Sequence, residues 1–460
     1  MNPGALESNG GVDSTALSQE GGGRAFRYLV MALCGAVAFV EGFDTQSVGF
    51  VAPSIARAFQ MKPDLLGLFF SVGLFGLMGG ALGFAPLADR YGRKPLILLG
   101  TLGFGLSSLC IALVGSVQAL FVLRFLTGLG LGAVMPNLIA LTAEYSPSRS
   151  RGFGVMLMFN GFTLGSIASG FVAAALVGRY GWQTIFVLGG AIPLVMLPAL
   201  VAFLPESLVW LASDRSRVMQ ARRLLQRAFP EMAVDPDASF MIDGTAARRS
   251  SLVELFRDRR TAKTLLLWTI FFTSLLDLYL LVSWLPTIVA SRGFGQGTAA
   301  IVGVMFQVGG IVGMFPIAWL SDRGAPARIL AAVYLVAALA IPLVGLASGS
   351  LWSICAMAFL AGVGILGGQN AANALAAACY PTRLRATAVG SALGVGRIGS
   401  IIGPIVAGVL IRANVSPRDI LLLAGLPALI TAAAAYALHW RAPDEDGVSA
   451  PLAAAAMSRC

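Results

Sequence analysis

Long apolar stretches alternate with short polar ones along almost the whole chain. Each stretch has about 20 or more mostly apolar residues, the length that an α-helix needs to cross a membrane. Apolar and polar residues do not alternate one by one, as they would in the strands of a membrane barrel. The pattern predicts an all-α membrane protein with twelve transmembrane helices, over residues 27–56, 64–86, 95–115, 118–143, 152–177, 182–203, 262–290, 297–320, 327–346, 352–377, 384–411 and 418–440.

Composition agrees with a membrane protein. Of the 460 residues, 57% are hydrophobic and only 12% are charged, and the mean hydropathy is +0.81; soluble domains carry about 25% charged residues. The net charge of +10 raises the question of a nucleic-acid partner. With both termini placed in the cytoplasm, however, 24 of the 32 Lys and Arg residues fall on the cytoplasmic side and six on the other. This bias follows the positive-inside rule, so the basic residues predict orientation and no nucleic-acid partner.

No motif indicates a cofactor, a metal or an ATP site. The five cysteines form no CxxC pair, the single histidine is His439, and no Gly-Lys dipeptide of a P-loop occurs. We find no nucleophile–histidine pair either, so we expect a protein that is not an enzyme.

The largest polar segment, residues 204–261, separates six spans from six. It contains "DRSRVMQARRLLQRAFP", which is typical of a basic amphipathic helix at a membrane surface; we favour a tethering linker over a regulatory site. The expected organisation is a disordered cytoplasmic tail (1–26), an N-terminal six-helix bundle (27–203), this linker, a C-terminal six-helix bundle (262–440) and a second cytoplasmic tail (441–460).

The two halves repeat each other in parallel. An offset of 233 residues brings Asp89 onto Asp322, Asp44 onto Asp277, and Asn137 onto Asn370. Two six-helix halves related in this way are the architecture of transporters that rock about a site near the middle of the membrane.

Two acidic residues interrupt the first span, in "FVEGFDTQSVGF". A charge at the bilayer centre costs at least about 2.5–3.5 kcal/mol, and Glu41 and Asp44, three residues apart, share one helix face. We interpret both as proton-coupling residues; the alternative is permanent neutralisation by an arginine. At 1.5 Å per residue, Arg124 lies roughly 9 Å into span four from one side and Asp44 roughly 25 Å into span one from the other. These depths predict an Asp44–Arg124 pair that breaks when Asp44 is protonated.

Arg397, near the middle of span eleven, has no counterpart in the first half, where Thr163 stands 234 residues earlier. Its guanidinium fits a carboxylate with two parallel hydrogen bonds, so we interpret it as the ligand of a substrate carboxylate; the alternative is a salt bridge with Asp277. Other polar residues inside the spans are candidates for lining the same cavity, although buried amides join helices as often as they bind ligands. They are Asp277, Tyr279, Asn137, Gln369, Asn370 and Asn373.

Several motifs resemble those of the major facilitator superfamily. They are "FAPLADRYGRKPL" after span two, "RFLTGLGLG" in span four and "LPESLVWL" after span six. The resemblance implies that the ends of spans two and eight carry gating ion pairs, although basic loops also orient helices without gating. The residues concerned are Asp89, Arg90, Arg93, Lys94, Asp322 and Arg323.

Three further segments resemble the aromatic acid:H⁺ symporter family, namely "EGFDTQSVGFVAPSI", "GAVMPNLIALTAEY" and "RATAVGSALGVGRIGSIIGPIVAG". This resemblance implies a protein of the bacterial inner membrane that imports a small aromatic carboxylate, such as benzoate, a hydroxybenzoate, gentisate or a phenylpropionate, together with protons and without ATP. Two positions depart from the family pattern: Glu41 stands where aspartate is usual, as in some phenylpropionate carriers, and Ala85 stands where glycine opens the loop motif.

Other functions fit the same fold. The acidic residues of the first span do not exclude a carrier for another organic anion or an exporter. A membrane receptor for aromatic acids is an alternative of a different class. Net flux of a labelled acid separates a transporter from a receptor.

Overall fold

The computed structural model describes residues 24–146, 151–228, 252–257, 260–347 and 350–440. The tail expected at 441–460, most of the tail expected at 1–26, and residues 229–251 of the linker lie outside the described residues.

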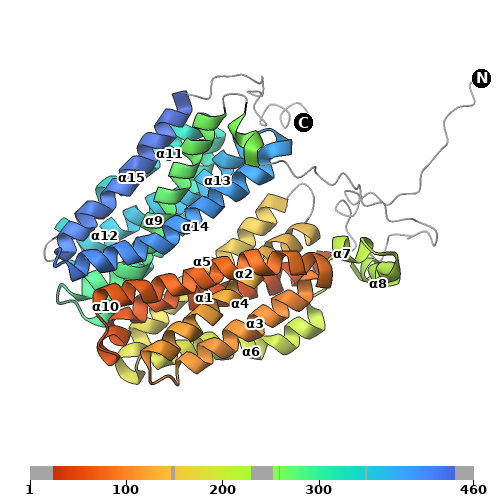
Figure 1. Ribbon diagram of the computed structural model, residues 1–460, viewed down its shortest axis with the longest axis horizontal. Coiled ribbons are helices and arrows are strands. Elements are labelled where there is room, and N and C mark those ends of the chain that lie inside the picture. Colours follow the sequence, from red (N-terminus) through yellow and green to blue (C-terminus); the bar gives the residue numbers. More distant parts are fainter. Residues whose placement is uncertain (1–23, 147–150, 229–251, 258–259, 348–349, 441–460) are drawn as a thin grey trace, which may run out of the picture. The chain divides into compact units, whose positions relative to one another are not determined.

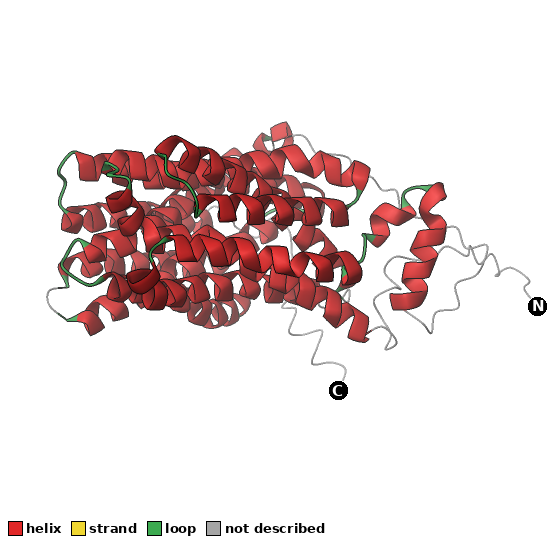
Figure 2. Cartoon of the chain, turned by 90° about the horizontal axis from the view of Figure 1, so that it is seen from below, coloured by secondary structure: helices red, strands yellow, loops and turns green. Residues whose placement is uncertain are grey.

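The described residues form helices and connecting turns, and none of them is in a strand (Figure 2). Twelve spans within them are long and apolar enough to cross a membrane, so the prediction of an all-α protein with twelve spans is confirmed. The helices are α1 (Arg24–Ala58), α2 (Pro63–Tyr91), α3 (Arg93–Ile111), α4 (Val117–Tyr145), α5 (Arg151–Tyr180), α6 (Gln183–Phe203), α9 (Thr261–Ala290), α10 (Gln296–Asp322), α11 (Pro326–Leu346), α12 (Leu351–Gly362) continued by α13 (Gly368–Ala378), α14 (Thr382–Arg412) and α15 (Pro417–Trp440) (Figure 1).

Two features of the backbone differ from the expectation. The tenth span is not one regular α-helix, because a π-helical turn at Val363–Gly367 separates α12 from α13. Only Gly92 separates α2 from α3. Most of the segment expected as a loop after the second span therefore belongs to the end of α2 and the first turn of α3. In the linker, the expected amphipathic helix is present as α8 (Val218–Ala228), after the short helix α7 (Leu208–Ala212).

The chain divides into two compact units. The first unit comprises residues 1–249, 279–308 and 400–420. In it α1 packs on α5, α2 on α4, and α3 on both α4 and α6. Its core is made of large apolar side chains with almost no exposure, among them Phe104, Leu131 and Leu138. It also contains the ends of four later helices, among them Tyr279–Ala290 of α9.

The second unit comprises residues 250–278, 309–399 and 421–460. In it α11 packs against α12, the π-helical turn and α13. Tyr334 of α11 is fully buried there. The division of the spans at the linker, into bundles at 27–203 and 262–440, stays a prediction.

Candidate functional site

A buried ion pair joins α1 and α4 in the first unit. Arg124 Nη1 donates to Asp44 Oδ2 at 3.0 Å, and the two side chains are 7% and 1% exposed. Ser108 of α3 donates to the other carboxylate oxygen at 2.8 Å. The sequence predicted this pair from the depths of the two residues in their spans, and the structure contains it.

Glycine in α2 makes room for the arginine. A Cβ atom at Gly73 would lie 2.8 Å from Arg124 Nε, closer than the two atoms can approach. The guanidinium therefore rests on bare backbone of α2 while it reaches Asp44. Glu41 lies one helical turn before Asp44 and is 1% exposed, so both acids of the first span are buried.

A small polar cavity lies beside the ion pair. Thr45, Gln46, Arg124, Tyr279 and Ser283 line it together with apolar side chains. Its volume is about 20 Å³. A cavity that accepts a benzene ring has about 150 Å³, so no aromatic acid fits beside Arg124 in this conformation.

The candidate substrate ligands of the sequence analysis are distributed over both units. Asp277 and Tyr279 lie on different sides of α9, and their assignment to one substrate cavity stays a prediction. Tyr279 lines the small cavity of the first unit, whereas Asp277 is fully buried inside the second unit. The reason is geometric, because residues two apart on a helix point to different sides.

The amides differ in their surroundings. Asn137 is 4% exposed and donates to the carbonyl of Ala133 in its own helix. In the second unit Gln369 accepts from Ser274 at 2.6 Å and donates to Asn373 at 3.5 Å. Asn370 is exposed and donates to the carbonyl of Leu366, so it does not share the buried side of Gln369. Arg397, in α14, is half-buried.

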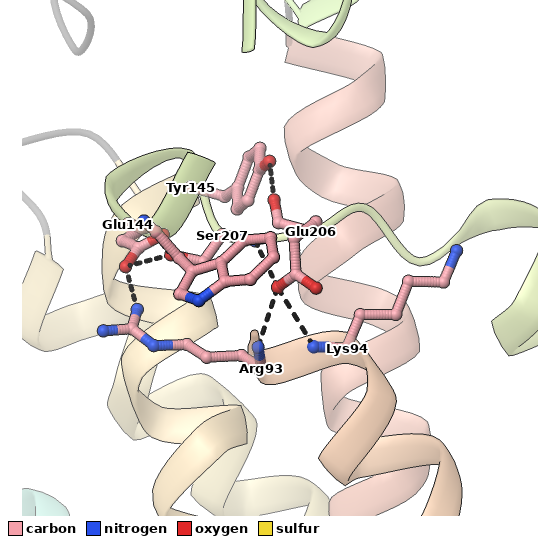
Figure 3. Close-up of polar contacts among 7 residues, drawn as sticks. Arg93, Lys94, Glu144, Tyr145, Glu206 and Ser207 are labelled. Atoms are coloured by element: carbon pink, nitrogen blue, oxygen red, sulfur yellow. Dashed lines mark hydrogen bonds and ion pairs between the residues drawn. The ribbon is translucent and has the colours of Figure 1, made fainter. Parts of the chain in front are cut away.

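The expected gating residues of spans two and three meet two acids that the sequence analysis did not name. Arg93 forms an ion pair with Glu144, at the end of α4. Glu206 Oε1 accepts hydrogen bonds from the backbone amides of Arg93, Lys94 and Ser207 at 2.8, 3.1 and 2.8 Å (Figure 3). Ser207 Oγ donates to Glu144 at 3.0 Å, which links the two acids.

Glu206 acts as an acceptor for the first amides of α3. These amides have no partner within the helix, and an anion at a helix N-terminus is favoured by the helix dipole. Gly92, which precedes α3, has a φ of 97°, and a Cβ atom there would lie 2.4 Å from Glu206 Oε2. Glycine is therefore required here both by the backbone conformation and by the approach of the carboxylate.

The remaining gating candidates whose side chains are described are exposed. Asp89 and Arg90 are exposed at the end of α2, where Arg90 lies over the ring of Tyr91. Arg323 lies over the ring of Trp319, 3.4 Å from its centroid. Asp322 ends α10, and its side chain lies outside the described residues.

Glu144 and Glu206 were within reach of the sequence analysis. Both lie in segments that carried the family resemblance, "GAVMPNLIALTAEY" and "LPESLVWL". Acidic residues at the ends of apolar spans, close to a basic loop, are the signal that identifies them. Arg93, the partner that they share, is more than 50 residues away from each of them in the chain, so spacing alone does not reveal the contacts.

We predict that Glu206→Ala destabilises the protein. The substitution removes a charged acceptor from three backbone amides, and hydrogen bonds to charged groups contribute about 1.5–3 kcal/mol each. Losing these hydrogen bonds should lower the midpoint of thermal unfolding, measured in detergent. Glu206→Gln, which keeps one acceptor oxygen, should lower this midpoint less. Equal midpoints for Glu206→Ala and the unsubstituted protein would contradict this role.

Polar contacts also join helix ends at the opposite end of the first unit. Arg57 of α1 donates to Gln296 of α10 at 3.1 Å, and Gln296 donates to Ser54 at 2.6 Å. Asp64 of α2 forms an ion pair with Arg412 of α14.

An aromatic contact reinforces this end. Trp284 of α9 is 1% exposed, donates from its indole to the carbonyl of Pro404 at 2.9 Å, and packs edge-on against Phe70. The ends of α1 and α2 are therefore closed against the ends of α9, α10 and α14 in this conformation.

Comparison with known proteins supports the fold and the family. The model of the Major Facilitator Superfamily matches residues 34–391 and 296–458. Among solved structures, a bacterial homologue of the human lysosomal transporter Spinster superposes with a TM-score of 0.71 at 19% identity, covering 90% of this chain and 97% of that one.

Relatives of known function are more similar in sequence. The 4-hydroxybenzoate transporter PcaK of Pseudomonas aeruginosa is 37% identical over 89% of this chain and 92% of its own length. The gallate transporter of Pseudomonas putida is 36% identical over 93% and 95%. The 3-(3-hydroxy-phenyl)propionate transporter of Escherichia coli is 35% identical over 90% and 94%. The chain therefore belongs to the Major Facilitator Superfamily and, within it, to the aromatic acid:H⁺ symporter family, whose members are transporters and not enzymes.

Proposed function

We propose that this protein imports a small aromatic carboxylate together with protons across the bacterial inner membrane by alternating access. The substrates in the names of its relatives, 4-hydroxybenzoate, gallate and 3-(3-hydroxy-phenyl)propionate, are all aromatic acids. The positive-inside bias supports cytoplasmic termini. The proton gradient supplies the energy, so ATP is not required.

The observation that carries proton coupling is the ion pair between Asp44 and Arg124. Both charges are buried, and removing one charge of such a pair leaves the other without compensation. A proton that binds Asp44 therefore changes the stability of this arrangement of α1 and α4. Ser108 holds the carboxylate toward Arg124. Glu41, on the same side of α1, is a second group able to receive the proton.

The closed end of the first unit supports a conformational cycle. Contacts of Arg57, Asp64 and Trp284 hold α1 and α2 against later helices. These contacts have to separate before the substrate enters from that end, which is the periplasmic one in the proposed orientation. At the other end, the Arg93–Glu144 pair is a candidate for the gate facing the cytoplasm.

Arg397 is the proposed ligand of the substrate carboxylate. A guanidinium holds a carboxylate through two parallel hydrogen bonds, whereas an ammonium acts as a point charge. The polar groups proposed to contact the ring substituents are Tyr279, Asn137, Gln369, Asn370 and Asn373.

We expect Arg397→Lys to weaken the apparent affinity for the acid about tenfold, the effect of losing roughly 1.4 kcal/mol. The measurement is the KM of uptake in proteoliposomes. Arg385→Lys is the matched control, because Arg385 lies in the same helix and is exposed. An unchanged KM in Arg397→Lys would contradict direct binding of the carboxylate by Arg397.

A counterflow experiment tests the substrate class. Proteoliposomes loaded with one unlabelled acid are diluted into the same labelled acid, with no proton gradient. The panel contains 4-hydroxybenzoate, gallate, 3-(3-hydroxyphenyl)propionate, benzoate and gentisate, and protein-free vesicles measure passive entry of the neutral acids. Protein-dependent exchange of at least one acid is expected. Exchange of none of them, in a preparation that exchanges another organic anion, would contradict the substrate class.

A further inference from the structure

Asp277 is a buried acid whose surroundings differ from those of Asp44. It lies in α9 within the second unit and is 0% exposed. Its carboxylate faces the backbone of Ala428 in α15, but neither oxygen reaches hydrogen-bond geometry with any described residue. Among the described residues, no lysine or arginine forms an ion pair with it.

The internal repeat allows the surroundings of Asp277 to be compared with those of Asp44. Asp277 stands 233 residues after Asp44, but the residue 233 positions after Arg124 is Met357. The first half of the chain thus pairs its membrane acid with a cation, and the second half places an apolar side chain at the corresponding position.

Hydroxyl groups lie near Asp277 instead of a cation. Tyr334 of α11, 0% exposed, is close enough to Asp277 for an electrostatic effect. The hydroxyl of Tyr334 is hydrogen-bonded to that of Ser274, one helical turn before Asp277. Ser274 also bonds to Gln369, which bonds to Asn373. Asn373 is half-buried, so a chain of polar groups leads from the neighbourhood of Asp277 toward a less enclosed position.

Burial of a carboxyl group favours proton binding for a simple electrostatic reason. Transferring an unpaired ionised carboxylate from water into a medium of low dielectric constant is so costly that the group binds a proton instead. A buried carboxyl group without a cationic partner is therefore suited to binding a proton.

We propose that Asp277 is a second proton-binding site of the transport cycle, in addition to the site of α1, where Asp44 and Glu41 together receive one proton. Its carboxylate binds one proton from the periplasmic side and releases it to the cytoplasmic side in each cycle. Two protons then accompany each monovalent carboxylate anion, and each cycle moves one net positive charge inward. This inference rests on the proposed function, because it concerns the protons that the carrier transports.

The positive charge that each transport cycle would move across the membrane makes the proposal measurable. A carrier that moves one proton with one anion does not respond to the membrane potential, whereas a carrier that moves two protons does. Proteoliposomes are prepared with equal pH on both sides, and a potassium diffusion potential with valinomycin makes the interior negative. The unsubstituted protein should then accumulate labelled 4-hydroxybenzoate, or whichever acid it exchanges, about tenfold for each ~59 mV.

Asp277→Asn is the variant that tests the role of Asp277. Asparagine imitates the neutral acid but binds no proton, so accumulation driven by the potential alone should disappear, whereas accumulation driven by a pH difference should approach about tenfold per pH unit. Asp419→Asn is the control, since Asp419 is exposed and belongs to no proposed proton site.

The outcomes separate this inference from the proposed function. If the unsubstituted protein accumulates the acid with a pH difference but not with a potential, Asp277 carries no transported proton and the inference is wrong, whether or not the variant folds. A variant that retains the full response to the potential would also overturn it. If neither force drives accumulation by the unsubstituted protein, the proposed function itself fails.

Discussion

Asp44→Asn should lower accumulation of the aromatic acid against its gradient from about a hundredfold to about tenfold per pH unit. Asparagine cannot release or bind the proton, so the coupling between protonation and the Arg124 contact is lost. The proton bound at Asp277 then drives the accumulation that remains. The measurement is uptake into proteoliposomes with an imposed inward proton gradient, with Asp419→Asn as the control.

A double variant separates this functional loss from a loss of stability. Asp44→Asn alone leaves Arg124 as an uncompensated buried charge, which costs about 3–5 kcal/mol when one partner of a buried pair is removed. Adding Arg124→Gln removes that charge, and the thermal midpoint should recover in part. Accumulation should remain at the level of Asp44→Asn in the double variant. Gradient-driven accumulation by Asp44→Asn at the level of the unsubstituted protein would contradict the assigned role of Asp44.

Gly49→Ala should reduce transport at least about tenfold, an effect that corresponds to roughly 1.4 kcal/mol. Gly49 lies in α1 where this helix approaches the end of α9, and an added Cβ atom would lie 2.3 Å from the carbonyl oxygen of Val282. A backbone carbonyl cannot move aside as the tip of a side chain can. The substitution therefore disfavours the conformation in which this end is closed, and the cycle lacks one of its two states.

Gly35→Ala is the matched control for this experiment. Gly35 lies in the same helix, and a Cβ atom there meets nothing within 4 Å. Both substitutions raise helix propensity by about 1 kcal/mol, so a difference between them reports the contact with α9. Initial uptake rates measure function, and distances between spin labels in the α1–α2 and α9–α10 loops measure closure. Equal uptake by the two variants, with unchanged loop distances, would show that close approach at Gly49 is not needed.

The fold was predictable because hydropathy is a strong signal over the length of a membrane span. The Asp44–Arg124 pair was also predictable, because two opposite charges at similar depth in an apolar layer have few other partners. The π-helical turn at Val363–Gly367 was not predictable, because it depends on packing in the tenth span and leaves no periodic pattern.

The contacts at the ends of the spans were harder to predict for another reason. Glu206 binds backbone amides, and the positions of backbone amides cannot be inferred from the types of the side chains. The separation of Asp277 from Tyr279 follows from helix geometry, but which side of α9 faces which neighbour depends on tertiary packing. Asn370 is exposed whereas Gln369 is buried, although their adjacency suggested a common role.

The central claim is that an inward proton gradient drives accumulation of an aromatic carboxylate by this protein. The most direct test is uptake of labelled 4-hydroxybenzoate, gallate and 3-(3-hydroxyphenyl)propionate into proteoliposomes that are more alkaline inside than outside, with protein-free vesicles subtracted. We predict that at least one acid accumulates above its external concentration and that a protonophore abolishes the accumulation. Protein-dependent uptake that reaches equilibrium only, with the gradient intact, would contradict proton coupling.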